Sequence, residues 1–279
     1  LVIILLILTA LPLAASAQTD EAATDPATTD TGAADPAATD SAARATSSSD
    51  RLFLGFIPEA AVARNQWWEG QFEIADHNNL DVILLRGVVA VQPWKRWEMG
   101  ASVGFGNTDT PAGVEDGTGA TDLDAWAKYF LGKSGDATEF AAGGLVTLPT
   151  GDDAAGLGRD SFALGAFGSL RHRFERFVLS VHAGIRFNGD GQVFDVELDG
   201  KASPIVGVGM IFPQSDRITF VAEANFEGAR FDGADSDVRL LGGLNWRFHN
   251  RGMFRGAIAF GLTDAAPDLQ LIGGYAWTF

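Results

Sequence analysis

Hydrophobic and polar positions alternate along most of this chain. The chain ends with LQLIGGYAWTF, in which one parity holds Leu269, Leu271, Gly273, Tyr275 and Trp277, while most positions of the other parity are small or polar. A period of two residues is typical of a β-strand with one apolar face. The segment therefore predicts a strand that has an apolar environment on one side and a small or polar one on the other.

The same alternation recurs from Trp67 onward in segments of about nine to fourteen residues, which turn residues separate. This repetition is typical of an outer-membrane barrel, so we predict an all-β fold: a transmembrane antiparallel β-barrel of about twelve strands. The predicted strands begin near Trp67, Asp81, Arg96, Asp122, Thr138, Asp160, Arg176, Ala202, Arg217, Asp237, Gly252 and Asp268.

The predicted connections alternate in length. PWKR, GKSGD, FER, PQSD and HNRG are short, whereas NTDTPAGVEDGTGAT, PTGDDAAGLGR, NGDGQVFDVELDGK and GARFDGADS fall between them and are long. Only DHNN is short for its position. Outer-membrane barrels have tight periplasmic turns and long external loops. We therefore expect both ends of the barrel to lie on the periplasmic side.

Aromatic residues gather near the predicted periplasmic ends of the strands, as in Trp94, Trp97, Trp246, Phe248, Phe254, Trp277 and Phe279. Aromatic rings of this kind sit at the headgroup level of a membrane. The last strand is expected to pair with the first, and its aromatic residues Tyr275, Trp277 and Phe279 resemble the signal that the outer-membrane assembly machinery reads. A soluble β-sandwich also alternates, but it explains neither the aromatic clustering nor the loop lengths.

Charged residues occupy the parity opposite to the predicted lipid face. Confinement to one parity supports a lumen, because an Arg or Lys on the lipid face near the midplane costs roughly 2–4 kcal/mol. The predicted pore-lining residues are Arg86, Glu98, Asp122, Asp124, Lys128, Glu139, Arg171, Arg173, His182, Arg186, Glu223, Arg239 and Arg247. These charges either form a selective lining or pair across the lumen and fill it, and strand number alone does not decide between the two.

The N-terminal part differs from the rest. Residues 1–17 form an apolar run that ends in Ala15-Ser16-Ala17, which predicts a secretory signal peptide, with a membrane anchor as the alternative. Residues 18–50 are rich in Ala, Thr, Asp and Pro and predict a disordered acidic tail in the periplasm. A solvated spacer is the plain reading of the tail, and peptidoglycan contact is the alternative. Residues 51–279 are assigned to the barrel.

The tail is more acidic for its length than the rest of the chain. The chain has a formal net charge of −16, and seven acids face only Arg44 in the tail: Asp20, Glu21, Asp25, Asp30, Asp35, Asp40 and Asp50. No basic surface for nucleic acid is expected. The chain contains no Cys, which excludes disulfides and thiolate metal sites. Acidic residues in the external loops predict a solvated surface, with divalent cations shared with lipopolysaccharide as the alternative, and we expect no metal site or cofactor within the protein.

Three stretches carry a resemblance to a known family: LPTGD at Leu148–Asp152, the following GLGRDSFALGAFGSL, and GLTDAAPDLQLIGGYAWTF. They resemble the meta-pathway phenol-degradation family of bacterial outer-membrane proteins, also labelled transporters. The similarity spans roughly Trp67 to Phe279, and its motifs contain no catalytic residues. The resemblance implies a barrel that takes up small organic solutes, including aromatic compounds.

Ser180 and His182 raise the question of a barrel hydrolase. Alternate residues of one strand point the same way but lie about 6–7 Å apart, which is too far for a nucleophile–base hydrogen bond. We therefore predict a non-enzyme: a passive outer-membrane channel or transporter for small organic solutes, in contact with membrane lipids and lipopolysaccharide. The rivals are an anchoring barrel with a plugged lumen and, less favoured, a hydrolase.

Overall fold

The computed structural model describes residues 52–53, 60, 66–77, 80–110 and 116–278. The predicted signal peptide, the acidic tail and Phe279 lie outside these residues. In the described part of the chain, no helix has the length and apolar character needed to cross a membrane.

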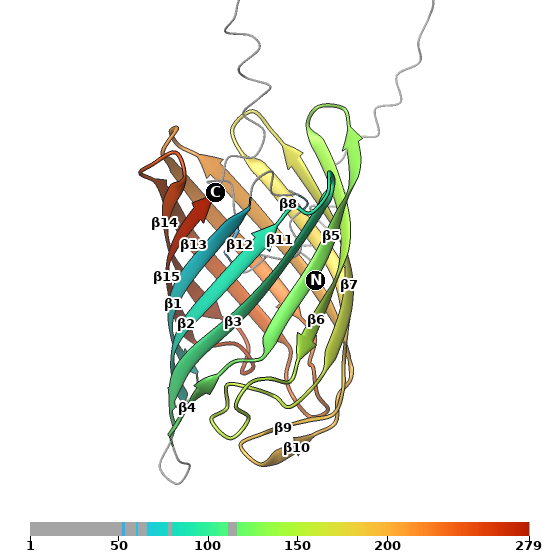
Figure 1. Ribbon diagram of the computed structural model, residues 1–279, viewed down its shortest axis with the longest axis vertical. Helices are drawn as coiled ribbons and strands as arrows, with labels where there is room; N and C mark the ends of the chain where they lie inside the picture. The colour runs from blue at the N-terminus through green and yellow to red at the C-terminus, as the bar shows by residue number, and fades with distance from the viewer. Residues whose placement is uncertain (1–51, 54–59, 61–65, 78–79, 111–115, 279) are drawn as a thin grey trace, which may run out of the picture. The chain divides into compact units, whose positions relative to one another are not determined.

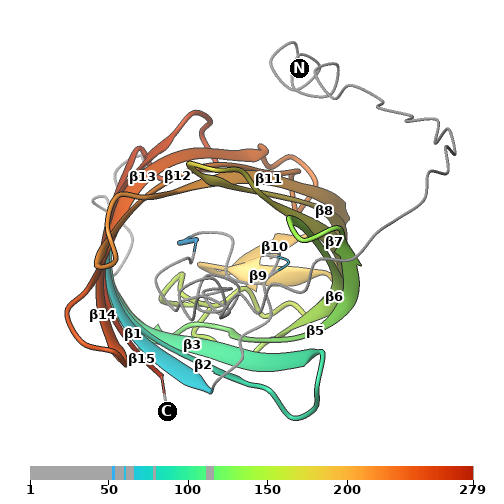
Figure 2. The ribbon, with the colours of Figure 1, turned by 90° about the horizontal axis from the view of Figure 1, so that it is seen from above.

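Twelve antiparallel strands form one closed barrel, as the alternation predicts (Figure 1). Each pairs with its sequence neighbours around the ring, which Figure 2 shows in the view from above. The barrel strands are β1 (Trp67–His77), β2 (Leu80–Val91), β3 (Trp97–Asp109), β5 (Leu123–Ser134), β6 (Thr138–Leu148), β7 (Ala163–Arg173), β8 (Val178–Asn188), β11 (Ala202–Pro213), β12 (Ile218–Glu227), β13 (Asp237–Arg247), β14 (Gly252–Gly261) and β15 (Leu269–Thr278).

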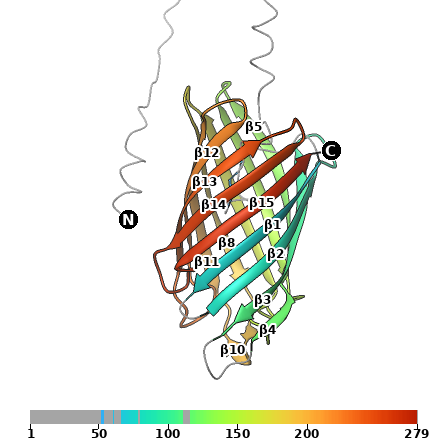
Figure 3. The same cartoon turned by 90° about the vertical axis from the view of Figure 1, so that its left-hand side faces the viewer.

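The barrel is closed by the pairing of the first strand with the last. In this pairing Trp68 lies opposite Trp277 and Phe72 lies opposite Gly273, and Figure 3 shows β1 and β15 side by side. Closure leaves no row of unpaired backbone N–H and C=O groups facing lipid, which would cost several kcal/mol per group. The prediction that the final strand closes the barrel is confirmed.

The connections alternate as predicted, and two of the long ones contain further strands. In one, β4 (Gly117–Ala120) continues the pairing with β3; in the other, β9 (Gly191–Val193) and β10 (Val196–Leu198) form a hairpin (Figure 1). The sequence reading treats these stretches as plain loops. Strands of three or four residues hold too few alternations to show a period.

The two faces of the wall follow the predicted parity. Outward side chains such as Leu85 and Phe105 are 62% and 59% exposed, whereas inward Glu98 and Lys128 are each 2% exposed. An apolar exposed face and a polar buried one suit a wall between lipid and a polar interior.

At the short-turn end, the ends of β13, β14 and β15 carry stacked or tilted rings. The ring centroids of Phe248 and Phe254 lie 4.7 Å apart, and those of Phe254 and Tyr275 lie 5.4 Å apart. These rings form part of the aromatic girdle that the sequence predicts near the short turns.

Candidate functional site

The short-turn half of the lumen is packed around a buried ion pair. Nη1 of Arg255 on β14 donates to both carboxylate oxygens of Glu69 on β1, at 2.8 and 2.6 Å, and Nε donates to Oδ1 of Asn245 at 3.1 Å. The side chains of the ion pair are 3% and 1% exposed. Buried charges are stable only where partners satisfy them. Here the charges are paired, and their side chains fill this part of the lumen.

Two residues that precede the first strand also lie inside the lumen. The carbonyl of Leu52 accepts a hydrogen bond from Arg255 Nη2 at 2.6 Å, and the backbone N–H of Phe53 donates to the Glu223 carboxylate. The Arg255 guanidinium lies 4.3 Å from the centroid of the Phe53 ring. These contacts hold Leu52 and Phe53 against the inner wall.

The apolar side chains of Leu52 and Phe53 complete a buried cluster. Its members from the wall are Val178, Ile211, Val221, Leu241, Ala257, Ala259 and Ile272. The wall residues have the parity of the lumen, where the sequence reading expects polar groups. Apolar residues at inward positions of these strands indicate that another apolar segment covers them. The sequence analysis did not use this pattern and so did not predict that Leu52 and Phe53 lie in the lumen.

A second buried ion pair joins β3 and β5. Lys128 Nζ lies 3.1 Å from Glu98 Oε1, with side chains 2% and 3% exposed, and Trp126 Nε1 donates to the same carboxylate at 3.4 Å. Both charged residues are among those predicted to line the pore. They face inward as predicted, but they fill the lumen by pairing.

Other predicted pore-lining residues lie near the short turns. Arg171 is buried, whereas Arg173 is exposed at the end of β7. Glu139 pairs with Lys133 at 3.1 Å, and the Arg247 guanidinium donates to the backbone carbonyl of Asp216. Arg247 therefore also holds the β11–β12 turn in place.

The long-loop half of the lumen contains a cavity of about 430 Å³. Its volume falls within the range of small-molecule sites. The predicted residues that line it are Arg86, Asp122, Asp124, His182, Arg186 and Arg239. The sequence reading missed Arg159 and Arg230, because loop residues have no strand parity to reveal their direction. Phe53 lines the cavity as well, so the segment before β1 contributes to its wall.

Most charges around the cavity are paired. Arg86 lies 3.3 Å from Glu73, and Arg239 bonds Asp237 with two of its nitrogens. Arg186 and Arg230 share the carboxylate of Glu227.

Two carboxylates of the cavity bind other parts of the protein. Asp122 accepts hydrogen bonds from the backbone N–H groups of Gly151 and Arg159, both at 3.0 Å, and Asp124 accepts one from Thr147 Oγ1 at 2.6 Å. Burial raises the pKa of Asp122 above its usual value, although the hydrogen bonds oppose this shift. Asp122 thus fastens the β6–β7 loop to the wall.

No protein-family model and no curated protein sequence matches the chain. Solved structures do match. The COG4313 outer membrane channel from Pseudomonas putida F1 superposes with a TM-score of 0.66 and 14% identity, covering 82% of this chain and 100% of that one. This protein has the fold of an outer-membrane channel.

Two porins agree with this result. The KdgM porin, solved in complex with oligogalacturonate, gives a TM-score of 0.55 at 8% identity and covers 76% of this chain and 99% of its own. The NanC porin gives 0.54 at 10% identity and covers 77% and 100%. At such low identity the likeness establishes the outer-membrane barrel fold and leaves the solute open.

The outer-membrane barrel does not assemble a hydrolase site from Ser180 and His182. Both side chains are buried on β8, and within the described residues Ser180 Oγ has no hydrogen-bond partner. His182 packs against the bare backbone of Gly207, where an added Cβ would lie 2.1 Å from its Cε1. Nucleophilic catalysis needs a serine bonded to its base. The described residues also contain no group of three or more metal-ligating side chains placed to hold an ion.

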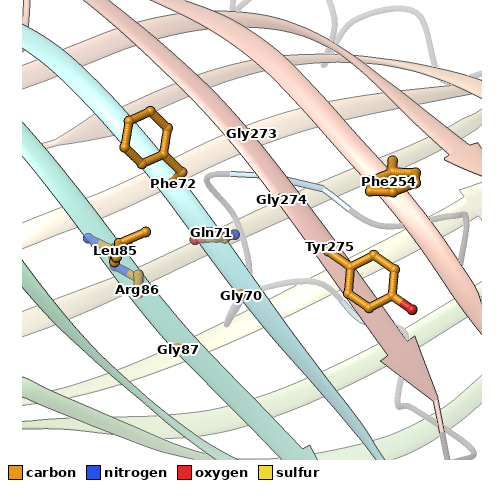
Figure 4. Close-up of a pocket in the computed structure, with 10 residues that line it drawn as sticks. All are labelled: Gly70, Gln71, Phe72, Leu85, Arg86, Gly87, Phe254, Gly273, Gly274 and Tyr275. Atoms are coloured by element: carbon orange, nitrogen blue, oxygen red, sulfur yellow. The ribbon is translucent and has the colours of Figure 1, made fainter.

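A second hollow, of about 510 Å³, lies in the wall where β14, β15, β1 and β2 run side by side (Figure 4). It forms where glycines leave the outer face bare between larger side chains. Its lining consists of Gly70, Gln71, Phe72, Leu85, Arg86, Gly87, Phe254, Gly273, Gly274 and Tyr275. The aromatic and aliphatic members have the outward parity, so this hollow belongs mainly to the lipid face.

Proposed function

We propose that this protein is a passive outer-membrane channel for small organic solutes. The observation that carries the proposal is the cavity of about 430 Å³ inside the closed barrel, with charged and apolar side chains on its wall. A channel needs a lumen whose wall binds solutes weakly enough to release them. It needs no catalytic group and no cofactor.

The lining suits molecules that combine an apolar body with a polar group. Leu84, Leu145 and Ile205 lie on the same cavity wall as Arg86 and Arg239. Small aromatic compounds, which the resemblance to the phenol-degradation family implies, have this character. We therefore include them in the proposed solute class.

The proposed location is the outer membrane of a Gram-negative cell, with the acidic tail of residues 18–50 in the periplasm. The outward apolar face then contacts lipid, and the long loops contact lipopolysaccharide. The barrel would reach this location through the assembly machinery, which we propose reads Tyr275, Trp277 and Phe279. Peptidoglycan contact by the tail remains our alternative to a plain spacer.

An anchoring barrel with a plugged lumen is the second candidate function. The observation that favours it is the packing of Leu52 and Phe53 against the inner wall beside the Arg255–Glu69 pair. The two candidates differ in whether ions and solutes cross the purified protein.

Electrical recording in planar bilayers separates these candidates. Arg186 faces the cavity, so Arg186→Glu should move the reversal potential of an open channel toward cation selectivity, most strongly at low salt where screening is weak. Ile185→Leu, on the outward face of the same strand, should leave selectivity unchanged. Absence of conductance in all three proteins would support the anchoring function. Conductance with unchanged selectivity in Arg186→Glu would contradict the placement of Arg186 in the ion path.

A further inference from the structure

Three arginines line one end of the cavity, and two of them share a single carboxylate. Glu227, the last residue of β12, accepts hydrogen bonds from Arg230 Nε and Nη2 at 2.8 and 2.7 Å. Arg186 Nη1 on β8 lies 3.2 Å from Oε1 of Glu227, the oxygen that also accepts from Arg230 Nε. Two guanidinium groups thus share one negative charge.

The third arginine, Arg159, adds a positive charge without a partner of its own. Its backbone is fixed on both sides, since its N–H donates to Asp122 and its carbonyl accepts from the Gln192 N–H at 2.8 Å. Its side chain is exposed and lines the cavity. Among the described residues, no carboxylate lies within ion-pair distance of its guanidinium.

The positive charges repel one another. Repulsion from Arg230 lowers the pKa of Arg159 to about 10, even though Glu227 and Asp122 act in the opposite direction. At neutral pH the group stays charged, so a positive charge with no ion-pair partner among the described residues lines this end of the cavity. A bound anion would relieve the repulsion.

A hydrogen-bond donor in the same place is also unused. Nε of Arg186 is buried, and within the described part of the chain nothing accepts a hydrogen bond from it. The nearby carboxylates of Asp122 and Asp124 already accept bonds from the loop backbone and from Thr147. Guanidinium groups bind carboxylates through charge-assisted hydrogen bonds.

We propose that Arg159, Arg186 and Arg230 form a binding site for the carboxylate of a small organic acid within the lumen. The apolar body of the acid lies against the cavity wall formed by Leu84, Leu145 and Ile205. This inference deepens the proposed channel function and rests on it, because the site would select which solutes enter from the long-loop side. Neutral analogues of the same shape would bind more weakly.

Isothermal titration of the purified, folded protein in detergent tests the site directly. The probes are benzoate and, as a neutral analogue of similar shape, benzyl alcohol. We expect benzoate to bind more tightly than benzyl alcohol, and Arg159→Gln to weaken benzoate binding by about tenfold, the usual effect of losing a charged hydrogen-bond partner. Arg159→Lys should retain part of the affinity because it keeps the charge.

Lys201→Gln is the matched control. Lys201 lies at the same end of the barrel, pairs with Asp232 at 3.3 Å and does not line the cavity. Lys201→Gln and Arg159→Gln each remove one positive charge, so an effect of net charge alone would weaken benzoate binding equally in the two variants. Heat-dependent mobility on gels verifies that each variant is folded.

Each outcome bears on one proposal. Benzoate binding that is equal in wild type, Arg159→Gln and Lys201→Gln would overturn the site, as would absent binding or equal affinity for benzyl alcohol. Benzoate binding that needs Arg159 in a protein without conductance would keep the site and refute the channel function. Conductance without benzoate binding would keep the channel function and refute the site.

Discussion

At the residue scale, the interior is held by charges that water does not reach. The Arg255–Glu69 pair connects β1 to β14, and Arg255 also holds the carbonyl of Leu52. Removing one partner of such a pair leaves the other buried and uncompensated, which costs more than the pair contributes.

We therefore expect Glu69→Gln to lower the free energy of unfolding by about 3 kcal/mol. Urea unfolding of the barrel in lipid vesicles, followed by tryptophan fluorescence, measures this change. Glu139→Gln is the control, because its partner Lys133 is 41% exposed and exposed pairs contribute less than about 1 kcal/mol. An equal loss of unfolding free energy in Glu69→Gln and Glu139→Gln would show that burial does not determine how much an ion pair contributes to stability.

Glycines on the inward face make room for large side chains. A Cβ on Gly143 would lie 2.6 Å from the Phe167 ring and 2.5 Å from the Ala127 carbonyl oxygen, whereas one on Gly168 would meet nothing within 4 Å. Gly143→Ala should therefore destabilise the barrel by about 1–3 kcal/mol through overpacking. Gly168→Ala serves as the matched control in the same unfolding measurement, and a larger loss for Gly168→Ala would contradict the packing seen here.

At the scale of elements, strand alternation is the strongest signal in the sequence. It predicts a direction for Glu98 and Lys128, because each lies within a long strand with a clear period. It does not predict that they form an ion pair, since pairing depends on the register between β3 and β5. Arg159 and Arg230 lie in loops, where no period exists, and only the folded chain brings them beside Arg186.

The closing strand gives a prediction at this scale. Phe279→Asp should sharply reduce assembly into the outer membrane while leaving export intact, because it alters the end of the strand that we propose the machinery reads. Heat-modifiable mobility and protease sensitivity of isolated cell envelopes measure assembly. Gln214→Asp adds the same charge to the exposed β11–β12 turn and should assemble normally. Normal assembly of Phe279→Asp would argue against the signal.

At the scale of the whole molecule, the barrel combines a filled half and an open half. The filled half contains Leu52, Phe53 and the two buried ion pairs, and the open half contains the cavity. Leu52 and Phe53 therefore occupy part of the lumen, although the sequence alone shows them only in a short apolar stretch without a repeat.

Deleting residues 51–66 should raise single-channel conductance several-fold, because it empties space that Leu52 and Phe53 now occupy. Deleting residues 18–50 is the control and should leave conductance nearly unchanged, since that stretch lacks side chains able to pack against the wall. Planar-bilayer recording of both deletions provides the comparison. If conductance rises only when residues 18–50 are deleted, the tail, and not Leu52 and Phe53, blocks the lumen.

The contacts of this segment also constrain the order in which the protein forms. Phe53 bonds a residue 170 positions later, and Leu52 bonds one 203 positions later. The partners of Leu52 and Phe53 thus emerge from synthesis almost at the end, and contacts of such separation form slowly. Leu52 and Phe53 therefore have these partners only after β12 and β14 exist. During that interval Leu52 and Phe53 are available to other apolar surfaces, so the start of the barrel domain needs protection until the barrel closes.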